Sequence, residues 1–565
     1  MRACCLALLI GLGGLLPGAD ERITIDAEAV VRTGADRVLG INIEYLSNGP
    51  RHREDPGSDS LIGALRAMGV RWLRFPGGET ADTHLFAKPP YHEPEPTLAR
   101  TGAQEWPAND RRFTASDDGT WWPGLAPMDF DEFMAICRAV GAEPIIVLPY
   151  DSAYRAASPD GTKPAIEELL EHAVAWVRYA NEIRDYDVRW WSLGNETDYA
   201  TDHTNGNPGA ARYAADLRRF AEAMHAVDPG IRLGAQGHSG DWFATVLAEA
   251  GEAVGFLDLH HYAGWSWTEG YRRYLETGPA LDPEVQMARS ALAEGPPATH
   301  DLPVVLSEFG VHDWSGGWLP HNDLGHALVL FDLIGTHLRH QQLQAACFWS
   351  TRWLDSSLTD LPLGEDLLAP IGLALRPQQW HVPDTVQADA ENGAEEPVLL
   401  LQGPGEVQQD LPTDLLEAGR SYTLRARYRT SLEAELDEEM ASLPALGIDL
   451  LRPNGGVERH AMVALPHAST RQLEERFRTP ADITGARLWI RSVPDAQMRL
   501  ADLHLLPGAA PSALDALADD DSLLPSGQVL ALWNRHLQPQ LLRAEATGPL
   551  RVWASRGPGR LSLWI

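Results

Sequence analysis

Cysteine is scarce in this chain of 565 residues, which holds four. Cys4 and Cys5 lie in the first few positions, while Cys137 and Cys347 are far apart and follow no ligand spacing. The sequence therefore excludes a disulfide framework and a zinc-type cysteine site. Cys137 and Cys347 are best explained as small buried apolar residues.

Positive charge is also in short supply. Lys and Arg total 46 against 79 Asp and Glu, which gives a formal net charge of −33. A surface this acidic repels phosphate backbones and anionic membranes, so nucleic acid is excluded as a partner. Long apolar runs are missing after the N-terminal region, and no later segment predicts a transmembrane helix.

Residues 1–19 read MRACCLALLIGLGGLLPGA, with one arginine before a short apolar run and small residues after it. The run is too short to cross a bilayer comfortably, and this layout is typical of a cleaved export signal. We therefore expect a secreted protein, extracellular or periplasmic, with no membrane insertion after signal cleavage. A non-cleaved anchor or a buried helix is the alternative.

Short apolar runs alternate with amphipathic helical patterns between residues 37 and 383. Segments such as FDEFMAICRAVG (130–141) carry apolar residues at helical spacing. Eight strands alternating with helices predict an α/β fold, a (β/α)8 TIM barrel over residues 37–383. An open, doubly wound sheet is the alternative. The runs that read as buried strands are 38–46, 70–78, 143–150, 188–196, 231–239, 256–264, 303–310 and 345–350.

Polar, turn-rich residues from position 384 mark a change of architecture. Short alternating strands without helices then predict an all-β sandwich over residues 384–510. Its pattern is similar to that of carbohydrate-binding jelly-roll modules, but it holds few aromatic residues, so a spacer role is an equal alternative. Residues 20–36 predict a strand of a small β side domain. Residues 511–565 predict a C-terminal β segment, for which pairing with residues 22–31 is one arrangement.

Titratable side chains end several of the predicted barrel strands. Chemistry in such barrels sits at the carboxyl ends of the strands, where Glu196 ends the fourth and Glu308 the seventh. Two carboxylates across one barrel mouth suit glycosidic bond cleavage, because one protonates the leaving oxygen and the other attacks the anomeric carbon. Arg74 at the second strand would keep Glu308 ionised as a nucleophile, which leaves Glu196 as the acid/base.

The strings at these strand ends are similar to known ones. WSLGNE (191–196) resembles the acid/base signature of the clan-A glycoside hydrolases, and LSEFG (306–310) resembles the nucleophile strand of that clan. LRFPGG (73–78), LGINIEYL (39–46) and LDLHHY (257–262) resemble segments of the α-L-arabinofuranosidases, which are retaining members of the clan.

The resemblance covers roughly residues 22–375 and implies a role for each matching residue. Glu196 is implied as the acid/base and Glu308 as the nucleophile of a retaining enzyme. No cofactor and no metal are implied. Substrate-binding or positioning roles are implied for Glu44, Arg74, Asn195, His260 and Tyr262.

Two positions depart from the arabinofuranosidase pattern. Glu79 follows the PGG string where those enzymes tend to have Asn, and Trp349 stands where many clan members have an aromatic floor. Both are expected to bind substrate, and Glu79 together with the 79–127 loop is expected to decide the sugar and the linkage. The main prediction is an arabinofuranosidase-like hydrolase of a plant or algal polysaccharide or oligosaccharide. Agarase-, xylosidase- or glucuronidase-like activity, or a non-catalytic carbohydrate-binding protein, are the alternatives.

Other polar and aromatic residues leave their roles open. The oxygen-rich string DHTNGNPG (202–209) favours a solvated turn over a calcium loop. Histidines near the strand ends show no metal-ligand spacing; they are His203, His238, His312 and His321. Loop tryptophans could stack on sugar rings or pack within their loops; they are Trp106, Trp121, Trp122, Trp265, Trp267, Trp314 and Trp318.

Overall fold

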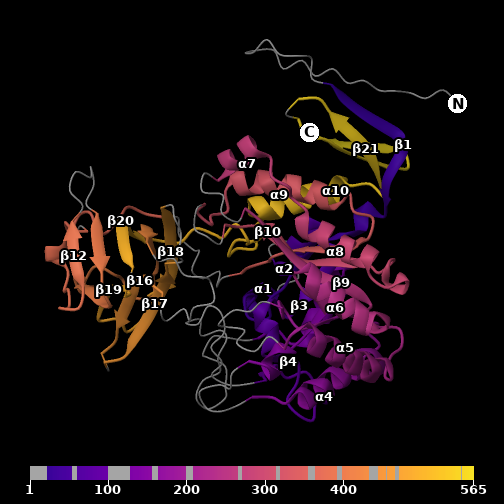
Figure 1. Ribbon diagram of the computed structural model, residues 1–565, viewed down its shortest axis with the longest axis horizontal. Helices are drawn as coiled ribbons and strands as arrows, with labels where there is room; N and C mark the ends of the chain where they lie inside the picture. Colours follow the sequence, from indigo (N-terminus) through magenta and orange to yellow (C-terminus); the bar gives the residue numbers. More distant parts are fainter. Residues whose placement is uncertain are drawn as a thin grey trace.

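A computed structural model gives the arrangement of the chain (Figure 1). It describes residues 22–53, 60–99, 127–155, 163–198, 208–264, 270–313, 318–353, 363–373, 375–390, 398–431, 443–453, 455–464, 470–494, 496–548 and 550–565. The export signal predicted at 1–19 and most of the 202–209 string lie outside these residues. So do His203, Trp106, Trp121, Trp122, Trp265, Trp267 and Trp314.

Eight parallel strands close into a barrel in the order β10-β11-β2-β3-β6-β7-β8-β9. This confirms the predicted (β/α)8 fold: six strands lie within the predicted apolar runs, and β10 and β11 overlap theirs. The strands are β2 (Leu39–Asn42), β3 (Trp72–Phe75), β6 (Glu143–Leu148), β7 (Trp190–Leu193), β8 (Arg232–Gln236), β9 (Phe256–Ala263), β10 (Val304–Val311) and β11 (Leu343–Phe348).

Large aromatic side chains fill the barrel below its mouth. Trp72, Trp190 and Phe256 pack edge to face or tilted, with ring centroids 5.5 Å and 5.2 Å apart. Glycine faces two of them: a Cβ on Gly40 would stand 2.5 Å from Trp72 Cβ, and one on Gly234 would stand 2.3 Å from the Phe256 ring. The barrel is therefore a packed core, with room for chemistry only at its end.

Helices surround the strands. The α3 sequence shows why they form: Asp129 and Glu132 make a capping box at its start, and Gly141 ends it in the left-handed conformation at φ 76°. The α-helices that precede the sandwich in the chain are α1 (Pro50–Arg53), α2 (Leu61–Met68), α3 (Phe130–Val140), α4 (Ile166–Val177), α5 (Ala210–His225), α6 (Gly240–Ala250), α7 (Tyr271–Thr277), α8 (Pro283–Glu294) and α9 (Leu324–His337).

The helix that follows β11 around the barrel comes from the far end of the chain. Helix α10 (Pro525–His536) packs between α9 and α2 and so closes the ring of helices (Figure 1). The prediction of a wholly β segment at 511–565 is therefore wrong. Pro525 sits in the first turn, and Leu530, Trp533 and Leu537 follow at helical spacing on the buried side.

The sandwich is confirmed and is inserted between β11 and α10 of the barrel. One sheet has the order β12-β13-β20-β15-β18 and the other β14-β19-β16-β17. Its core begins earlier than residue 384, since Leu368, Leu375 and Trp380 pack into it. The strands are β12 (Gln387–Ala390), β13 (Leu399–Gln402), β14 (Gly405–Asp410), β15 (Ser421–Thr430), β16 (Ala445–Leu451), β17 (Val457–Val463), β18 (Arg471–Arg478), β19 (Gly485–Ser492) and β20 (Gln497–Pro507).

Strand β18 lies on the side of the sandwich that faces the barrel (Figure 1). The Glu474 side chain on this strand is 2% exposed. Its carboxylate lies 2.8 Å from Nε2 of His321, which belongs to the barrel. Arg425 on β15 and Arg476 complete the cluster, at 3.0 Å and 3.3 Å from the Glu474 carboxylate. A buried polar contact therefore fixes the sandwich against the loop that follows β10.

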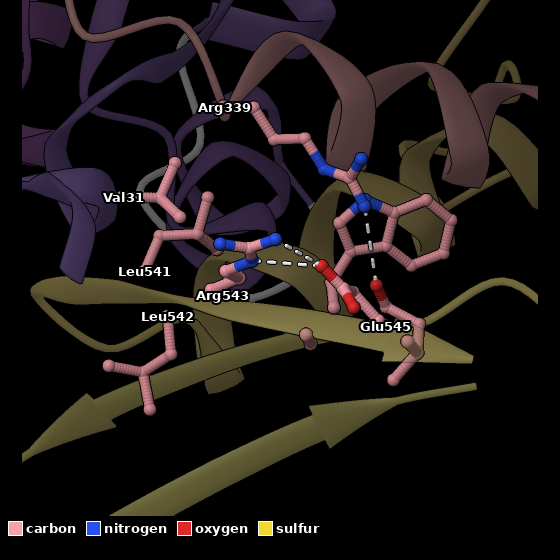
Figure 2. A pocket seen from close by; sticks show the side chains of 9 residues that line it. Val31, Arg339, Leu541, Leu542, Arg543 and Glu545 are labelled. Carbon is pink, nitrogen blue, oxygen red and sulfur yellow. Dashed lines mark hydrogen bonds and ion pairs between the residues drawn. The ribbon is translucent and has the colours of Figure 1, made fainter. Parts of the chain in front are cut away.

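A small sheet of order β1-β21-β22-β23 forms the side domain and contains the strand predicted at 22–31. Strand β1 (Ile23–Thr33) pairs antiparallel with β21 (Gln540–Ala546), followed by β22 (Trp553–Gly557) and β23 (Arg560–Trp564). A shallow hollow lies where this sheet meets α9 (Figure 2). Two polar contacts border it: Arg339 donates to the Val552 carbonyl at 3.5 Å, and Arg543 pairs with Glu545 at 2.8 Å.

Several smaller expectations have a clear outcome. Cys137 and Cys347 are buried free thiols, in α3 and β11. Trp318 stacks on His326 with ring centroids 3.6 Å apart, so it packs against helix α9, which follows its loop. A two-stranded sheet of β4 (His84–Leu85) and β5 (Thr97–Leu98) follows β3. No helix in the described ranges has the length and apolar content needed to cross a bilayer.

Candidate active site

Glu308 lies on β10 at the barrel mouth, with both carboxylate oxygens bound. Arg74 Nη1 donates to Oε1 at 2.7 Å, and the Tyr262 hydroxyl donates to Oε2 at 2.6 Å. A register irregularity between Leu306 and Glu308 interrupts the strand pairing. Such a bulge changes the direction of a side chain, which lets Ser307 and Glu308 both point into the barrel.

Arg74 is fully buried and connects three strands. Besides Glu308 it donates to Asn42 Oδ1 at 3.0 Å and to Asn195 Oδ1 at 2.7 Å. Burial alone would lower the pKa of Arg74, but the charges of Glu308 and of the buried Asp258 raise it above its ordinary value. The guanidinium is therefore a permanent cation that orients one carboxylate and one amide at the mouth.

Strand β9 contributes three polar residues by alternation. Asp258, His260 and Tyr262 are two apart, so their side chains line the same inner face. Burial, and then the charge of Glu308, raise the pKa of Tyr262 well above its usual value, so it stays a neutral donor. Burial lowers the pKa of His260 well below its usual value, so its imidazole is neutral.

Glu196 follows β7 in a tight, left-handed turn. Gly194 has φ 78° and Glu196 itself has φ 52°, a conformation that non-glycine residues adopt only where the surroundings impose it. Asp151 holds this turn: its Oδ2 accepts from the Asn195 backbone N–H at 3.2 Å and from Thr197 Oγ1 at 3.1 Å. The Glu196 side chain is 20% exposed, so it faces the mouth.

His260 joins the two glutamates. Its Nδ1 lies 2.9 Å from Glu196 Oε1 and 3.5 Å from Glu308 Oε2. Its Nε2 lies 3.5 Å from Arg74 Nη2, which can only donate, so the imidazole proton belongs on Nδ1. The two carboxylate oxygens can be no farther apart than these two Nδ1 distances together. That limit admits the roughly 5–5.5 Å between the carboxyl groups of retaining glycosidases.

Glycine brings the PGG loop against both sides of the site. A Cβ on Gly77 would stand 3.0 Å from Glu44 Cγ, and one on Gly78 would stand 2.7 Å from Glu308 Oε1 and 2.8 Å from Trp349 Cη2. Glu44, which is buried, accepts a hydrogen bond from the Ser47 hydroxyl. Glu79 begins the short helix that follows this loop, and its side chain is half-buried.

Eight of the nine residues singled out by sequence thus meet in one place, since each contacts another of the set or the PGG loop. They are Glu44, Arg74, Asn195, Glu196, His260, Tyr262, Glu308 and Trp349. Glu79 adjoins Gly78 in the chain.

Sequence reasoning missed a second set of polar residues around this site. Asn42 accepts from Arg74, Asp258 lies below it, and Asp151 holds the acid/base turn. The sequence singled out His238 without giving it a role, and it lies beside Glu196 together with Asp198: His238 Nε2 is 3.8 Å from Glu196 Oε1. Asp258 could have been found from the sequence. Strand residues two apart face the same side, so Asp258 shares the inner face with His260.

The comparisons with known proteins point to one family. Residues 64–278 match the model of the "Alpha-L-arabinofuranosidase 1 domain". An "Intracellular exo-alpha-(1->5)-L-arabinofuranosidase" of Acetivibrio thermocellus is 23% identical over 273 residues, 43% of this chain and 48% of the relative. A protein of the same name from Streptomyces lividans is 26% identical over 268 residues, 43% of this chain and 37% of the relative. The matches thus span less than half the length of these two relatives.

A solved structure of an α-L-arabinofuranosidase from Thermotoga maritima aligns with 86% of this chain and 99% of its own, at 16% identity and a TM-score of 0.43. The fold itself is established by the closed eight-stranded sheet. The domain match and the curated relatives therefore show that this part of the chain is similar to the α-L-arabinofuranosidases.

Proposed function

We propose that the protein is a retaining glycoside hydrolase of the α-L-arabinofuranosidase type, with Glu308 as nucleophile and Glu196 as acid/base. The shared contact of His260 Nδ1 with both carboxylates carries this proposal, because it holds them at a separation suited to double displacement. Arg74 and Tyr262 support the assignment of roles, since they bind both oxygens of Glu308 and orient it for attack.

In the first step Glu308 attacks the anomeric carbon, and the bond from that carbon to the leaving oxygen breaks. Glu196 gives its proton to the departing oxygen, so the aglycone leaves as an alcohol. A glycosyl ester on Glu308 remains, and the negative charge has moved from Glu308 to Glu196. The Nδ1–H of His260 lies 2.9 Å from Glu196 Oε1 and can stabilise that new charge.

In the second step Glu196 takes a proton from water while the water oxygen attacks the anomeric carbon. The ester bond breaks, Glu308 regains its charge, and two inversions give net retention. Asn195 is held by Arg74 and by Asp151, so its amide is fixed beside the sugar-binding position. Trp349 offers an apolar surface beside Glu308, which suits the C–H groups of a sugar ring.

For the substrate we propose α-L-arabinofuranosyl groups on plant or algal polysaccharides or oligosaccharides, on the names of the relatives. Glu79 and Trp349 depart from the pattern of those enzymes, so the substrate is tested by a panel. It comprises para-nitrophenyl glycosides of α-L-arabinofuranose, β-D-xylose, β-D-galactose and β-D-glucuronic acid. The arabinofuranoside is expected to be turned over with the highest kcat/KM.

The mechanism is tested with Glu308→Ala and Glu196→Ala on the best aryl glycoside of that panel. Both variants should lose most of kcat. Azide should restore turnover of Glu196→Ala by replacing water, and the glycosyl azide should keep the configuration of the substrate. With Glu308→Ala any azide product should have the opposite configuration, because the azide then replaces the nucleophile.

The matched control is Glu284→Gln. Glu284 pairs with His261 outside the two-glutamate site, so this variant should keep its activity. Full turnover by either alanine variant, or azide products of the reverse configurations, would overturn the assignment of roles. If the unchanged protein does not hydrolyse the arabinofuranoside but does hydrolyse another glycoside of the panel, only the proposed substrate is overturned.

We further propose that the chain is exported by the signal-like residues 1–19. Expression in a bacterium with the general secretory pathway, followed by N-terminal sequencing of the periplasmic fraction, tests this. A protein that keeps Met1 and stays in the cytoplasm would contradict the proposal.

A further inference from the structure

We propose that Glu196, His238 and His260 also form a binding site for a transition-metal dication such as Zn²⁺, and that the bound ion blocks the active site. Each residue offers one ligand atom, and the three atoms lie within 4.8 Å of one another. The sequence could not indicate this site, because its ligands lie far apart in the chain: Glu196 follows β7, His238 follows β8, and His260 is in β9.

The three ligand atoms surround one point beside Glu196. Glu196 Oε1 lies 2.9 Å from His260 Nδ1 and 3.8 Å from His238 Nε2. The two imidazoles meet edge to face with centroids 5.2 Å apart. The side chains of His260 and His238 are 1% and 10% exposed. An ion at this point would therefore be enclosed on the protein side and open only towards the mouth.

An outer carboxylate already orients one of these ligands. His238 Nδ1 lies 2.9 Å from Asp198 Oδ1, and the His238 backbone N–H donates to Asp198 Oδ2 at 2.7 Å. This leaves Nε2 as the atom of His238 that faces Glu196. Histidines that bind metals are held in the same way, with the second nitrogen hydrogen-bonded to a carboxylate. The hydrogen bond between Asp198 and His238 therefore supports an ion site independently of the distances between the ligand atoms.

The ligand set determines the class of ion. Two imidazole nitrogens and one carboxylate oxygen suit Zn²⁺, Cu²⁺, Ni²⁺ or Co²⁺, whereas Mg²⁺ and Ca²⁺ prefer oxygen ligands alone. The carboxylate of Glu308, 3.5 Å from His260 Nδ1, adds negative charge next to the ion. Binding displaces the proton on His260 Nδ1, which passes to the solvent.

Occupancy by the ion is incompatible with the proposed catalysis. Glu196 bound to a metal is held as a carboxylate and has no proton for the leaving oxygen. The ion is also bound to Glu196 Oε1, beside the place where the leaving oxygen would lie. A metal ion at this site is therefore expected to inhibit in competition with the sugar.

The experiment measures binding without turnover. The full chain is stripped with a chelator and titrated with Zn²⁺, and then with Mg²⁺, by isothermal titration calorimetry and thermal unfolding. We expect one high-affinity Zn²⁺ per chain with a rise in Tm, and no saturable response to Mg²⁺. His238→Asn should weaken Zn²⁺ binding by more than tenfold, and Asp198→Asn by roughly 10–100-fold.

His300→Asn is the matched control, because His300 is exposed and its imidazole lies against the Gly295 carbonyl, near the opposite end of β10 from the glutamates. It should bind Zn²⁺ as the unchanged chain does. Equal affinity in His238→Asn, Asp198→Asn and the control would overturn the site, and so would binding of Mg²⁺ at the same affinity. Only the inhibition of turnover depends on the proposed function, so failure of that function leaves the calorimetric result unaffected.

Discussion

Gly78 lies against the carboxylate of Glu308, and a Cβ on residue 78 would stand only 2.7 Å from Oε1. Gly78→Ala should therefore displace Glu308 or the Trp349 ring and lower kcat on the order of 100-fold, as misplacement of a reacting group does. Steady-state kinetics and circular dichroism would measure the effect. Gly240→Ala is the control, because its nearest atom is 3.8 Å away. Full kcat in Gly78→Ala would contradict this prediction.

Removal of the Arg74 cation should destabilise the barrel as well as stop the chemistry. Arg74→Met leaves the buried carboxylates of Glu308 and Asp258 without their shared positive charge, at a cost of about 3–5 kcal/mol in the free energy of unfolding. Adding Asp258→Asn should recover part of that stability but none of the activity. Urea unfolding and kcat/KM of both variants test this. A double variant no more stable than Arg74→Met would argue against it.

The contact between sandwich and barrel should weaken in acid. Burial alone would raise the pKa of Glu474, but His321, Arg476 and Arg425 lower it to about 2, below its ordinary value of 4.5. A lowered pKa means that this stabilisation is complete above about pH 4.5 and is lost as the pH falls towards 2. Its size is on the order of 3 kcal/mol.

Glu474→Gln measures this dependence directly. At pH 7 the variant should unfold at a lower temperature than the unchanged chain, and the gap should narrow steadily below about pH 4.5. Glu545→Gln is the control, since it breaks only the exposed pair with Arg543 and should change Tm little at any pH. A gap for Glu474→Gln that stays constant down to pH 3 would show that the carboxylate does not titrate as expected.

Trp533 on α10 should stabilise the barrel although it lies far from the glutamates. It is fully buried and stacks on Trp564 with ring centroids 4.5 Å apart. Trp533→Ala should cost about 3–5 kcal/mol in the free energy of unfolding and leave kcat of the folded protein nearly unchanged. Leu532→Ala on the same helix is the control, because Leu532 is 44% exposed. Equal stability of the two variants would refute the role of α10.

The barrel and its two glutamates could be predicted because their signals are local. Parallel strands are buried on both faces, so they read as continuous apolar runs, and a charged residue at the end of such a run stands out. Glu196 and Glu308 each follow a run of this kind. The register irregularity that turns Glu308 into the barrel depends on pairing with β9, which no single strand sequence contains.

The parts that were missed depend on distant contacts. Helix α10 was taken for a strand, because its Leu and Trp residues are explained only by the α2 and α9 surfaces they cover. Strand β18 could not be recognised as buried from its own residues, since RQLEERFR has the charge of an exposed segment. Its Glu474 is buried beside Arg476 of the same strand, and the partners that the strand sequence does not contain are His321 and Arg425.

The position of α10 after the sandwich bears on the order of events during synthesis. A growing chain that has left the ribosome as far as β11 holds every barrel strand and both glutamates, yet α2 and α9 still expose the apolar faces that α10 will cover. The sandwich emerges next and can form its own core before α10 is available to cover α2 and α9. Ribosome-bound chains arrested just before Pro525 should thus be far more susceptible to protease in the barrel than in the sandwich.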